Sequence, residues 1–151
     1  MKRIAIIVAA VLITTSTVLM ATENDNVVQD LVNTATTFYQ EKGQEYSLKV
    51  FNALHGPFVK GELYVFAGTF DGKILAHPYD KSVVEKTVLD MKDTNGKLII
   101  QEMIAVAKNQ DNGWVEYSWP YPGTKEMALK RCYVRRIPSQ DIWLAAAYYI
   151  K

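Results

Sequence analysis

The chain has 151 residues, the length of one globular domain, and 49% of them are hydrophobic, an ordinary share for a packed core. The formal net charge is +1 with no basic run, which argues against a nucleic-acid-binding protein, because neutralising phosphates requires clustered Lys and Arg. Cys132 is the only cysteine, so an internal disulfide is excluded and the core must be stable by packing alone.

The N-terminal segment, residues 1–21, has the layout of a secretory signal peptide. Two basic residues precede the apolar run from Ile4 to Ile13, and Ala21 is a small residue at a plausible cleavage point. We therefore predict export to the periplasm or beyond, with residues 22–151 as one mature domain. The alternative is an uncleaved anchor in the cytoplasmic membrane, although the segment is barely long enough to span a bilayer.

Two helices are predicted at the start of the mature domain. Apolar residues recur at spacings of three and four from Val27 to Tyr39, which is one face of an amphipathic helix. Asn24 to Asn26 can cap its first turn, and Gly43 stands where a left-handed C-terminal residue is needed. A second, shorter helix from Tyr46 to Leu54 is stopped by Gly56-Pro57.

A β-hairpin follows these helices. The segment from Glu62 to Thr69 is rich in β-branched and aromatic residues, Asp71-Gly72 is a two-residue turn signal, and Lys73 to His77 continues in an extended pattern. Pro78 cannot donate to a ladder and ends the second strand.

The rest of the chain predicts one more helix and three strands. The helix follows Asn95-Gly96, has apolar residues along one side, and ends by Gly113. The three extended segments are Trp114–Trp119, Lys130–Ile137 and Ile142–Tyr149. These elements predict an α+β domain with a central antiparallel sheet of about five strands, flanked by the long first helix and the shorter ones.

Short motifs in a characteristic order run from about Val27 to the C-terminus. They are Phe51-Asn52 with Gly56-Pro57-Phe58, Gly61 to Phe66, Asp71 to Pro78, Leu89 to Asp93, Gly113 to Tyr117, Trp119-Pro120, and Lys130 with Tyr133-Val134. In order and spacing they resemble the single Cache domain of type 2, a PAS-like extracellular sensor module. The resemblance implies a pocket for a small ligand on one face of the sheet, in domains that usually belong to chemoreceptors and sensor kinases. Small carboxylates such as acetate, propionate, pyruvate or lactate are frequent ligands of such sensors.

The sequence departs from the family pattern at three places. The closing strand has Ala145-Ala146-Ala147 where family members often have glycines, and Arg131-Cys132 replaces small hydroxyl residues. Glu85-Lys86 stands where a Gly-Lys pair is often found. We expect the added bulk to shift the size of the ligand or to remove binding.

A small-ligand pocket needs an apolar wall and a few converging polar groups. Because side chains alternate along a strand, Tyr117 and Trp119 share one face and suit a pocket wall, although aromatic residues on strands often simply fill a core. Phe66 points to the same side of the hairpin as Tyr64 and is a further wall candidate. Met103 could cover the pocket from the helix, although Met at helical spacing usually packs.

Three residues are candidates for holding a carboxylate. His77, at a strand end, could donate to the ligand or could bond to neighbouring backbone. Lys130 supplies a positive charge, and Tyr133 supplies a directional hydroxyl donor. Because Lys130 and Tyr133 are three positions apart, a regular strand puts them on opposite faces, so either a bulge intervenes or only one reaches the ligand.

Enzyme chemistry has little support in the sequence. The two histidines do not lie at a zinc-binding spacing, and neither a Gly-x-Ser-x-Gly elbow nor a phosphate-binding glycine loop occurs. Cys132 falls in mid-strand, where a cysteine is more often a small hydrophobic residue than a nucleophile. We therefore expect no catalysis, no cofactor and no metal site.

Two functions remain open from the sequence. The first is an extracytoplasmic sensor domain for a small organic acid, acting in signal transduction or chemotaxis. Because the chain ends two residues after the last predicted strand, its signal would pass through a partner such as a membrane receptor or a sensor kinase. The second is a ligand-free interaction module that docks onto an envelope receptor or kinase.

Overall fold

The computed structural model describes the backbone of residues 5–121 and 124–150 and, within these ranges, the side chains from residue 23 onward. The helices are α1 (Ala5–Lys42), α2 (Gln44–Phe51) and α3 (Ile99–Gln110). The strands are β1 (Val59–Lys60), β2 (Leu63–Thr69), β3 (Ile74–Ala76), β4 (Asn112–Pro120), β5 (Met127–Arg136) and β6 (Ile142–Tyr149). The predicted α+β class is confirmed, with a short β1 added to the five predicted strands.

One antiparallel sheet joins these strands in the order β1-β2-β6-β5-β4, with β3 paired to β2. The hairpin of β2 and β3 turns at Gly72, whose φ of +86° suits glycine. Strands β4, β5 and β6 run side by side with unbroken register, so that Lys130 stands between Tyr117 and Tyr149. This continuous ladder fixes which side chains of β5 face each side of the sheet.

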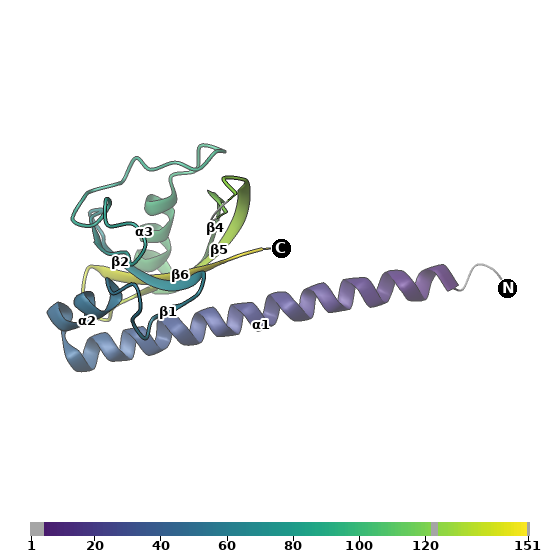
Figure 1. The fold of residues 1–151 in the computed structure, drawn as a ribbon, viewed down its shortest axis with the longest axis horizontal. Helices are drawn as coiled ribbons and strands as arrows, with labels where there is room; N and C mark the ends of the chain where they lie inside the picture. Colours follow the sequence, from purple (N-terminus) through teal and green to yellow (C-terminus); the bar gives the residue numbers. More distant parts are fainter. Residues whose placement is uncertain (1–4, 122–123, 151) are drawn as a thin grey trace.

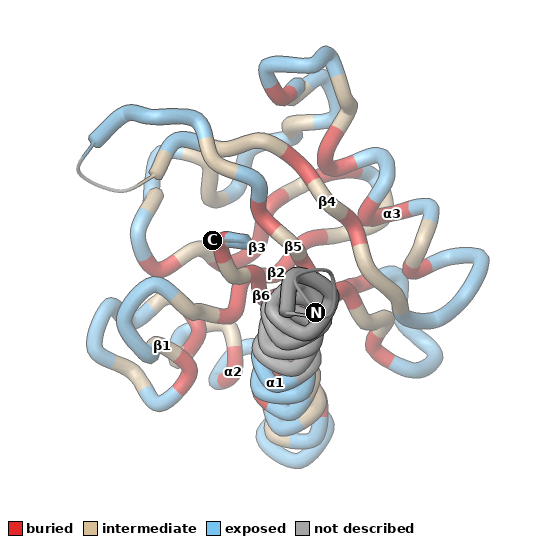
Figure 2. The backbone as a smooth tube through the Cα atoms, turned by 90° about the vertical axis from the view of Figure 1, so that its right-hand side faces the viewer, coloured by how far each residue is buried: buried red, intermediate tan, exposed pale blue. Residues whose placement is uncertain are grey.

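Helix α1 crosses one face of the sheet and α3 packs on the other (Figure 1). Two apolar clusters result, one between the sheet and α1 and one between the sheet and α3. Buried residues gather on the central strands and on the sides of the helices that face them, whereas the loops are mostly exposed (Figure 2). The predicted cover of one sheet face by the long first helix is therefore confirmed.

The ends of the helices differ from the sequence-based expectation at several points. Asn24 to Asn26 do not cap α1, because the helix is continuous from Ala5. Gly43 ends it as predicted, with φ of +80° and its N–H donated to the Tyr39 carbonyl at 2.9 Å. Helix α2 stops at Phe51 rather than Leu54. Helix α3 ends at Gln110, followed by Asp111 with a positive φ of +62°, and Gly113, expected to end this region, lies inside β4.

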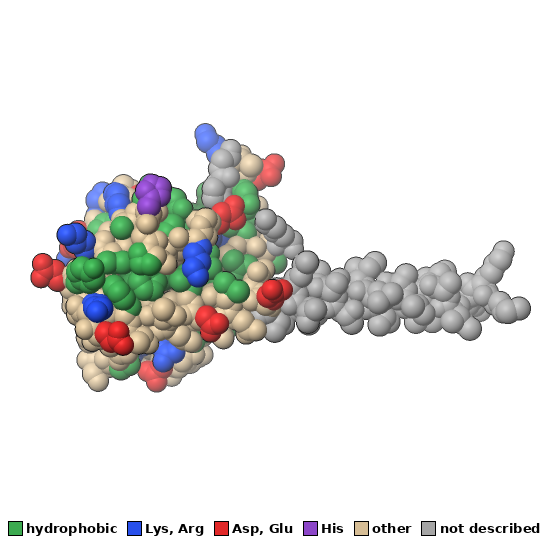
Figure 3. Space-filling model, turned by 60° about the horizontal axis from the view of Figure 1, so that its bottom comes forward, with side chains coloured by type: hydrophobic (Ala, Val, Ile, Leu, Met, Phe, Trp, Pro, Cys, Tyr) green, Lys and Arg blue, Asp and Glu red, His purple; other side chains and the backbone are tan. Residues whose placement is uncertain are grey.

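The predicted signal peptide covers residues 1–21, whose side chains lie outside the described part of the chain. Its cleavage stays a prediction. In the part of the chain that the structure describes, no helix is both long enough and apolar enough to cross a membrane. Over the face drawn in Figure 3, basic and acidic side chains are interspersed with apolar ones.

Close approach of α1 to β6 depends on a small residue. Ala146 is fully buried in the cluster beneath α1, together with Val28, Leu31, Val32 and Ala35 of the helix. A larger side chain at position 146 would have to push the helix away from the sheet, because packed interiors leave few voids.

We expect Ala146→Leu to lower the free energy of unfolding by about 1–3 kcal/mol, the usual cost of overpacking a core. Urea denaturation followed by circular dichroism measures the change. The control Thr34→Leu adds bulk to the exposed side of α1. It should change the free energy of unfolding by no more than about 0.5 kcal/mol. Equal effects of the two substitutions would contradict tight packing of α1 on β6.

Candidate functional site

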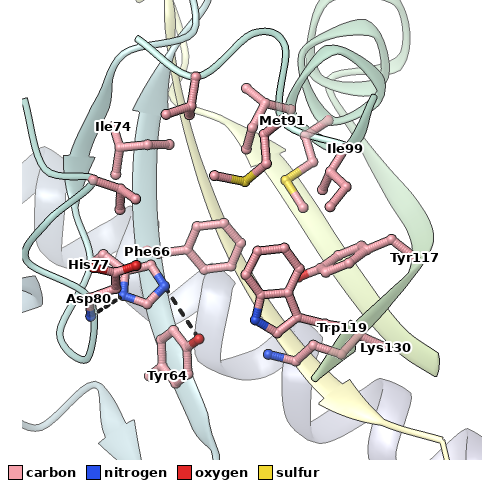
Figure 4. A pocket seen from close by; sticks show the side chains of 14 residues that line it. Tyr64, Phe66, Ile74, His77, Asp80, Met91, Ile99, Tyr117, Trp119 and Lys130 are labelled. Carbon is pink, nitrogen blue, oxygen red and sulfur yellow. Dashed lines mark hydrogen bonds between the residues drawn. The ribbon is translucent and has the colours of Figure 1, made fainter. Parts of the chain in front are cut away.

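A cavity of about 60 Å³ lies between the α3 side of the sheet and the segment that connects β3 to α3. Its walls come from β2, β3, β4, β5, α3 and the connecting segment, so residues far apart in the sequence meet there (Figure 4). Since a buried water takes up roughly 10–15 Å³ of such space, the cavity suits a ligand of about four to six non-hydrogen atoms.

Strand alternation brings most of the predicted site residues together in this cavity. Six of the seven candidates line it, namely Phe66, His77, Met103, Tyr117, Trp119 and Lys130. They come from β2, the end of β3, α3, β4 and β5, and each strand contributes alternate positions because successive side chains point to opposite faces. The expected grouping of Tyr117 with Trp119 holds, since their rings lie 6.2 Å apart in an edge-on arrangement.

Tyr133 is the candidate that the structure places elsewhere. It faces α1, in the cluster on the other side of the sheet from the cavity. Its hydroxyl donates to Asn112 Oδ1 at 3.0 Å, and its ring packs against Trp114. Because β5 runs without a bulge between positions 130 and 133, only Lys130 reaches the cavity.

Lys130 carries a buried positive charge at one end of the cavity. Its residue is only 4% exposed, and its Nζ lies 4.8 Å from the ring centre of Tyr149 and 5.3 Å from that of Tyr64. No carboxylate forms an ion pair with it within the described part of the chain. Burial lowers the pKa of Lys130, because the charged form loses its hydration, and the opposite effects of Cys132 and Glu62 offset only part of that loss.

His77 is held as a neutral ring that directs one N–H toward Tyr64. Its Nδ1 accepts the backbone N–H of Asp80 at 2.8 Å, so the ring proton belongs on Nε2, which lies 3.4 Å from Tyr64 Oη. Burial lowers the pKa of His77 to about 4, outweighing the opposite effect of Asp80. Burial likewise raises the pKa of Tyr64, so both groups are neutral hydrogen-bond partners near pH 7.

Polar and apolar groups occupy opposite ends of the cavity (Figure 4). Tyr64, His77, Trp119 and Lys130 gather at one end, while Ile74, Met91 and Ile99 line the other. The cavity can therefore hold an anion at the first end and a short apolar group at the second.

The segment from His77 to Leu98, here called the roof, closes the cavity on the side away from the sheet. It contributes Asp80, Val83, Val88 and Met91 to the lining. Backbone bonds fix it to the hairpin, including Glu85 N–H to the Ile74 carbonyl at 2.7 Å. The roof is thus a bonded layer of the fold.

Asp93 fastens the end of the roof to β4. Its carboxylate accepts the backbone N–H groups of Asn95 at 2.8 Å, Lys97 at 2.9 Å and Ser118 at 3.0 Å. These bonds, led by the one from Ser118, hold the pKa of Asp93 below its usual value. Since Ser118 lies between Tyr117 and Trp119, Asp93 positions the roof directly beside the aromatic wall.

Sequence reasoning missed several lining residues for a definite reason. Asp80, Val83, Val88 and Met91 lie in the roof, which has neither helical nor strand periodicity to show which side chains turn inward. Asp93 did carry a signal, because an Asp two residues before Asn95-Gly96 is typical of a turn in which the side chain bonds to following backbone.

The described residues contain neither a candidate metal site nor a reactive cysteine. No group of three or more His, Cys, Asp or Glu side chains that could hold a metal lies among them. Burial raises the pKa of Cys132 to about 12, so its thiol stays protonated and is a poor nucleophile.

Comparison with known proteins agrees with this geometry. A family model described as the Cache domain matches residues 18–151. The chain belongs to the Cache domain family. It is therefore a signalling sensor module of the kind found in the extracellular parts of membrane receptors, which confirms the resemblance read from the sequence motifs.

Two relatives of the chain are signalling proteins. The chain is 30% identical over 101 residues to the methyl-accepting chemotaxis protein McpP of Pseudomonas putida. The matched region covers 67% of this chain and 18% of McpP. It is 34% identical over 80 residues to the sensor histidine kinase MctS of Rhizobium johnstonii. This matched region covers 53% of this chain and 16% of MctS. The chain thus spans less than a fifth of either relative over the matched region.

Solved structures share the fold at low sequence identity. A Cache chemosensory domain, described for the structural basis of its carboxylic acid recognition, superposes with a TM-score of 0.75 at 24% identity, covering 87% of this chain and 97% of that one. A methyl-accepting chemotaxis protein from Vibrio parahaemolyticus gives a TM-score of 0.78 at 19% identity, covering 91% and 96%.

The neutral state of His77 should make the stability of the domain depend on pH. Its pKa is about 4 in the folded state against 6.5 for an exposed histidine, so folding favours the uncharged ring. The stabilisation is complete above pH 6.5 and is lost as the pH falls toward 4, by about 3 kcal/mol at most. Urea denaturation across this pH range measures the loss.

The matched control uses the other histidine. His77→Gln should flatten the dependence between pH 6.5 and 4, whereas His55→Gln, at an exposed turn position, should leave it unchanged. A His77→Gln variant that loses stability in acid as steeply as the wild type would rule out a buried neutral His77.

Proposed function

We propose that this Cache domain is an extracytoplasmic sensor for a small organic acid of the acetate, propionate, pyruvate and lactate class. It acts in signal transduction or chemotaxis through a membrane receptor or sensor kinase. Support for export comes from the signal-peptide layout of residues 1–21. Support for the signalling role comes from the relatives, which are a chemotaxis protein and a sensor kinase.

The ammonium of Lys130, which has no ion-pair partner among the residues that the structure describes, is the observation that carries this proposal. A buried cation without a counterion is costly, and a ligand carboxylate would supply the missing charge. His77 Nε2–H, the Tyr64 hydroxyl and the Trp119 indole lie at the same end of the cavity and can donate to the remaining carboxylate lone pairs.

Size and polarity narrow the ligand to a short monocarboxylate. Acetate, propionate, pyruvate and lactate fit a cavity for about four to six non-hydrogen atoms. The far end is lined by Ile74, Met91 and Ile99, which favours an alkyl group there. A second carboxylate would find no second lysine or arginine in the lining and would be buried among Ile74, Met91 and Ile99 at the far end.

A thermal-shift screen of the purified chain tests the proposal. We expect one or more of these four acids to raise the midpoint of unfolding, because a ligand at 100 times its dissociation constant adds about 2.7 kcal/mol of stability. Succinate should give little or no shift, since it adds a second charge in an apolar space. Titration calorimetry on the best acid then gives the affinity.

Lys130→Met separates binding from folding. We expect this variant to lose the shift with every acid and yet to be more stable than the wild type without ligand, by about 1–4 kcal/mol, because an unpaired buried charge is replaced by an apolar side chain. The matched control Lys49→Met removes an exposed lysine of α2 and should keep both the shift and the stability.

Two results would overturn the assignment. An acid-dependent shift that survives in Lys130→Met would place the anion elsewhere. Failure of all four acids at millimolar concentration, with capture of a receptor or kinase by the unliganded protein, would instead support a ligand-free interaction module.

A further inference from the structure

Strand β5 presents two cationic side chains to opposite sides of the sheet at adjacent positions. Lys130 faces the cavity, and Arg131 faces helix α1. Across the ladder, Lys130 stands opposite Tyr149 and Arg131 opposite Tyr148. The pair of Lys130 and Tyr149 therefore lies on the cavity side, and the next pair, Arg131 and Tyr148, lies on the α1 side. One peptide unit separates the two pairs on each strand.

Arg131 is the centre of a polar cluster on the α1 side, here called the clamp, which comprises Asp25, Glu116, Arg131 and Tyr148. Arg131 grips the Asp25 carboxylate of α1 with two bonds, from Nε at 2.9 Å and from Nη2 at 3.2 Å. Its Nη1 donates to Glu116 Oε1 at 2.5 Å, and its guanidinium lies 4.6 Å from the Trp114 ring centre. The Tyr148 hydroxyl donates to Asp25 Oδ1 at 2.9 Å.

The clamp lies where α1 leaves the sheet. Asp25 is near the first of the described side chains, and the part of α1 before it extends beyond the sheet (Figure 1). Deeper along the helix, the contacts with the sheet are largely apolar, through Val28, Val32 and Ala35. In the described chain, Asp25–Arg131 is the only ion pair that joins α1 to the sheet. Arg131 is therefore the residue that makes the charged contact between the sheet and the part of α1 that leaves it.

We propose that the clamp couples the state of the cavity to helix α1, with Arg131 as the residue that transmits the change. The ammonium of Lys130 is held only by the faces of Tyr64 and Tyr149, and an anion in the cavity would draw it away from Tyr149. Because Lys130 and Arg131 share a peptide unit, as do Tyr149 and Tyr148, a shift of the first pair moves the second. Both residues of the second pair bond to Asp25, so the motion reaches α1.

Coupling of this kind is reciprocal, so that the cavity affects the clamp and the clamp affects the cavity by the same factor. The identity of the trigger, an anion at Lys130, rests on the proposed function. The link between the two faces is a property of the strands themselves and can be measured without any ligand.

Amide hydrogen exchange of the purified chain provides the test. The readout is the exchange rate of the α1 amides from Val27 to Leu31, compared with the most protected amides of β6, which report global unfolding. Lys130→Met, which removes the cavity charge, should change these α1 rates at least fivefold, the lower end of typical coupling between sites. In an Arg131→Met background the same substitution should change them less than about twofold, because the transmitting residue is gone.

Arg135→Met supplies the matched control. Arg135 lies on the same strand and the same face, and its Nη1 donates to Asn33 of α1 at 2.5 Å, but neither of its strand neighbours lines the cavity. The effect of Lys130→Met on α1 should therefore persist in this background. If Arg131→Met does not fold, Arg131→Lys, which keeps the charge and loses the two-point grip on Asp25, takes its place.

Three outcomes would overturn the coupling: no change of α1 exchange in Lys130→Met, an equal change with and without Arg131, or a change lost equally in Arg135→Met. None of them depends on an organic acid. A chain that binds no acid but shows the expected pattern would refute the proposed ligand class alone, and a chain that binds acetate without the pattern would refute the clamp alone.

Discussion

The buried ammonium of Lys130 is the constraint on which the rest of the site depends. Lys130 is only 4% exposed, so its charge must be offset by its surroundings, and the described residues offer it two aromatic faces rather than an ion pair. The same surroundings keep His77 and Tyr64 uncharged, since both pKa shifts favour the neutral form. Lys130 therefore places a buried positive charge at one end of the cavity at some cost to stability, which is the arrangement expected of a binding site for an anion.

The regular pleat of β5 turns this single charge into an organised site. Its unbroken register with β4 and β6 sends Lys130 and Cys132 to the cavity side and Arg131 and Tyr133 to the α1 side. A bulge between Lys130 and Arg131 would have put both side chains on the cavity side, where the two cations would repel each other. The sheet thus separates the cavity on one side from the α1 interface on the other.

Sequence reasoning succeeded where local physics decides the structure and failed where tertiary contacts do. The Asp71-Gly72 turn, the extended patterns of β4, β5 and β6 and the helical spacing of α3 are local signals, and they indicated the hairpin, the sheet and the elements that carry six cavity residues. Tyr133 was a poor candidate because its spacing from Lys130 already conflicted with strand alternation. The roof was not predictable, since its path depends on long-range bonds such as those of Asp93 to Ser118. The α1 partner of Arg131, Asp25, is equally invisible to any local pattern.

The departures from the family pattern lie in different parts of the fold, on the α1 side of the sheet, on its α3 side and in the roof. Arg131, which replaces a small hydroxyl residue, does not narrow the cavity, because it points to Asp25 of α1. Ala145 and Ala147 face the α3 side of the sheet but are not among the residues that line the cavity, whereas Ala146 lies beneath α1. Glu85, where glycine is often found, adopts a φ of +65° in the roof and is tied to Lys73 at 3.1 Å. The departures at positions 131 and 85 thus lie in the helix interface and in the roof, and neither residue lines the cavity, so they leave the groups that gather at its charged end unchanged.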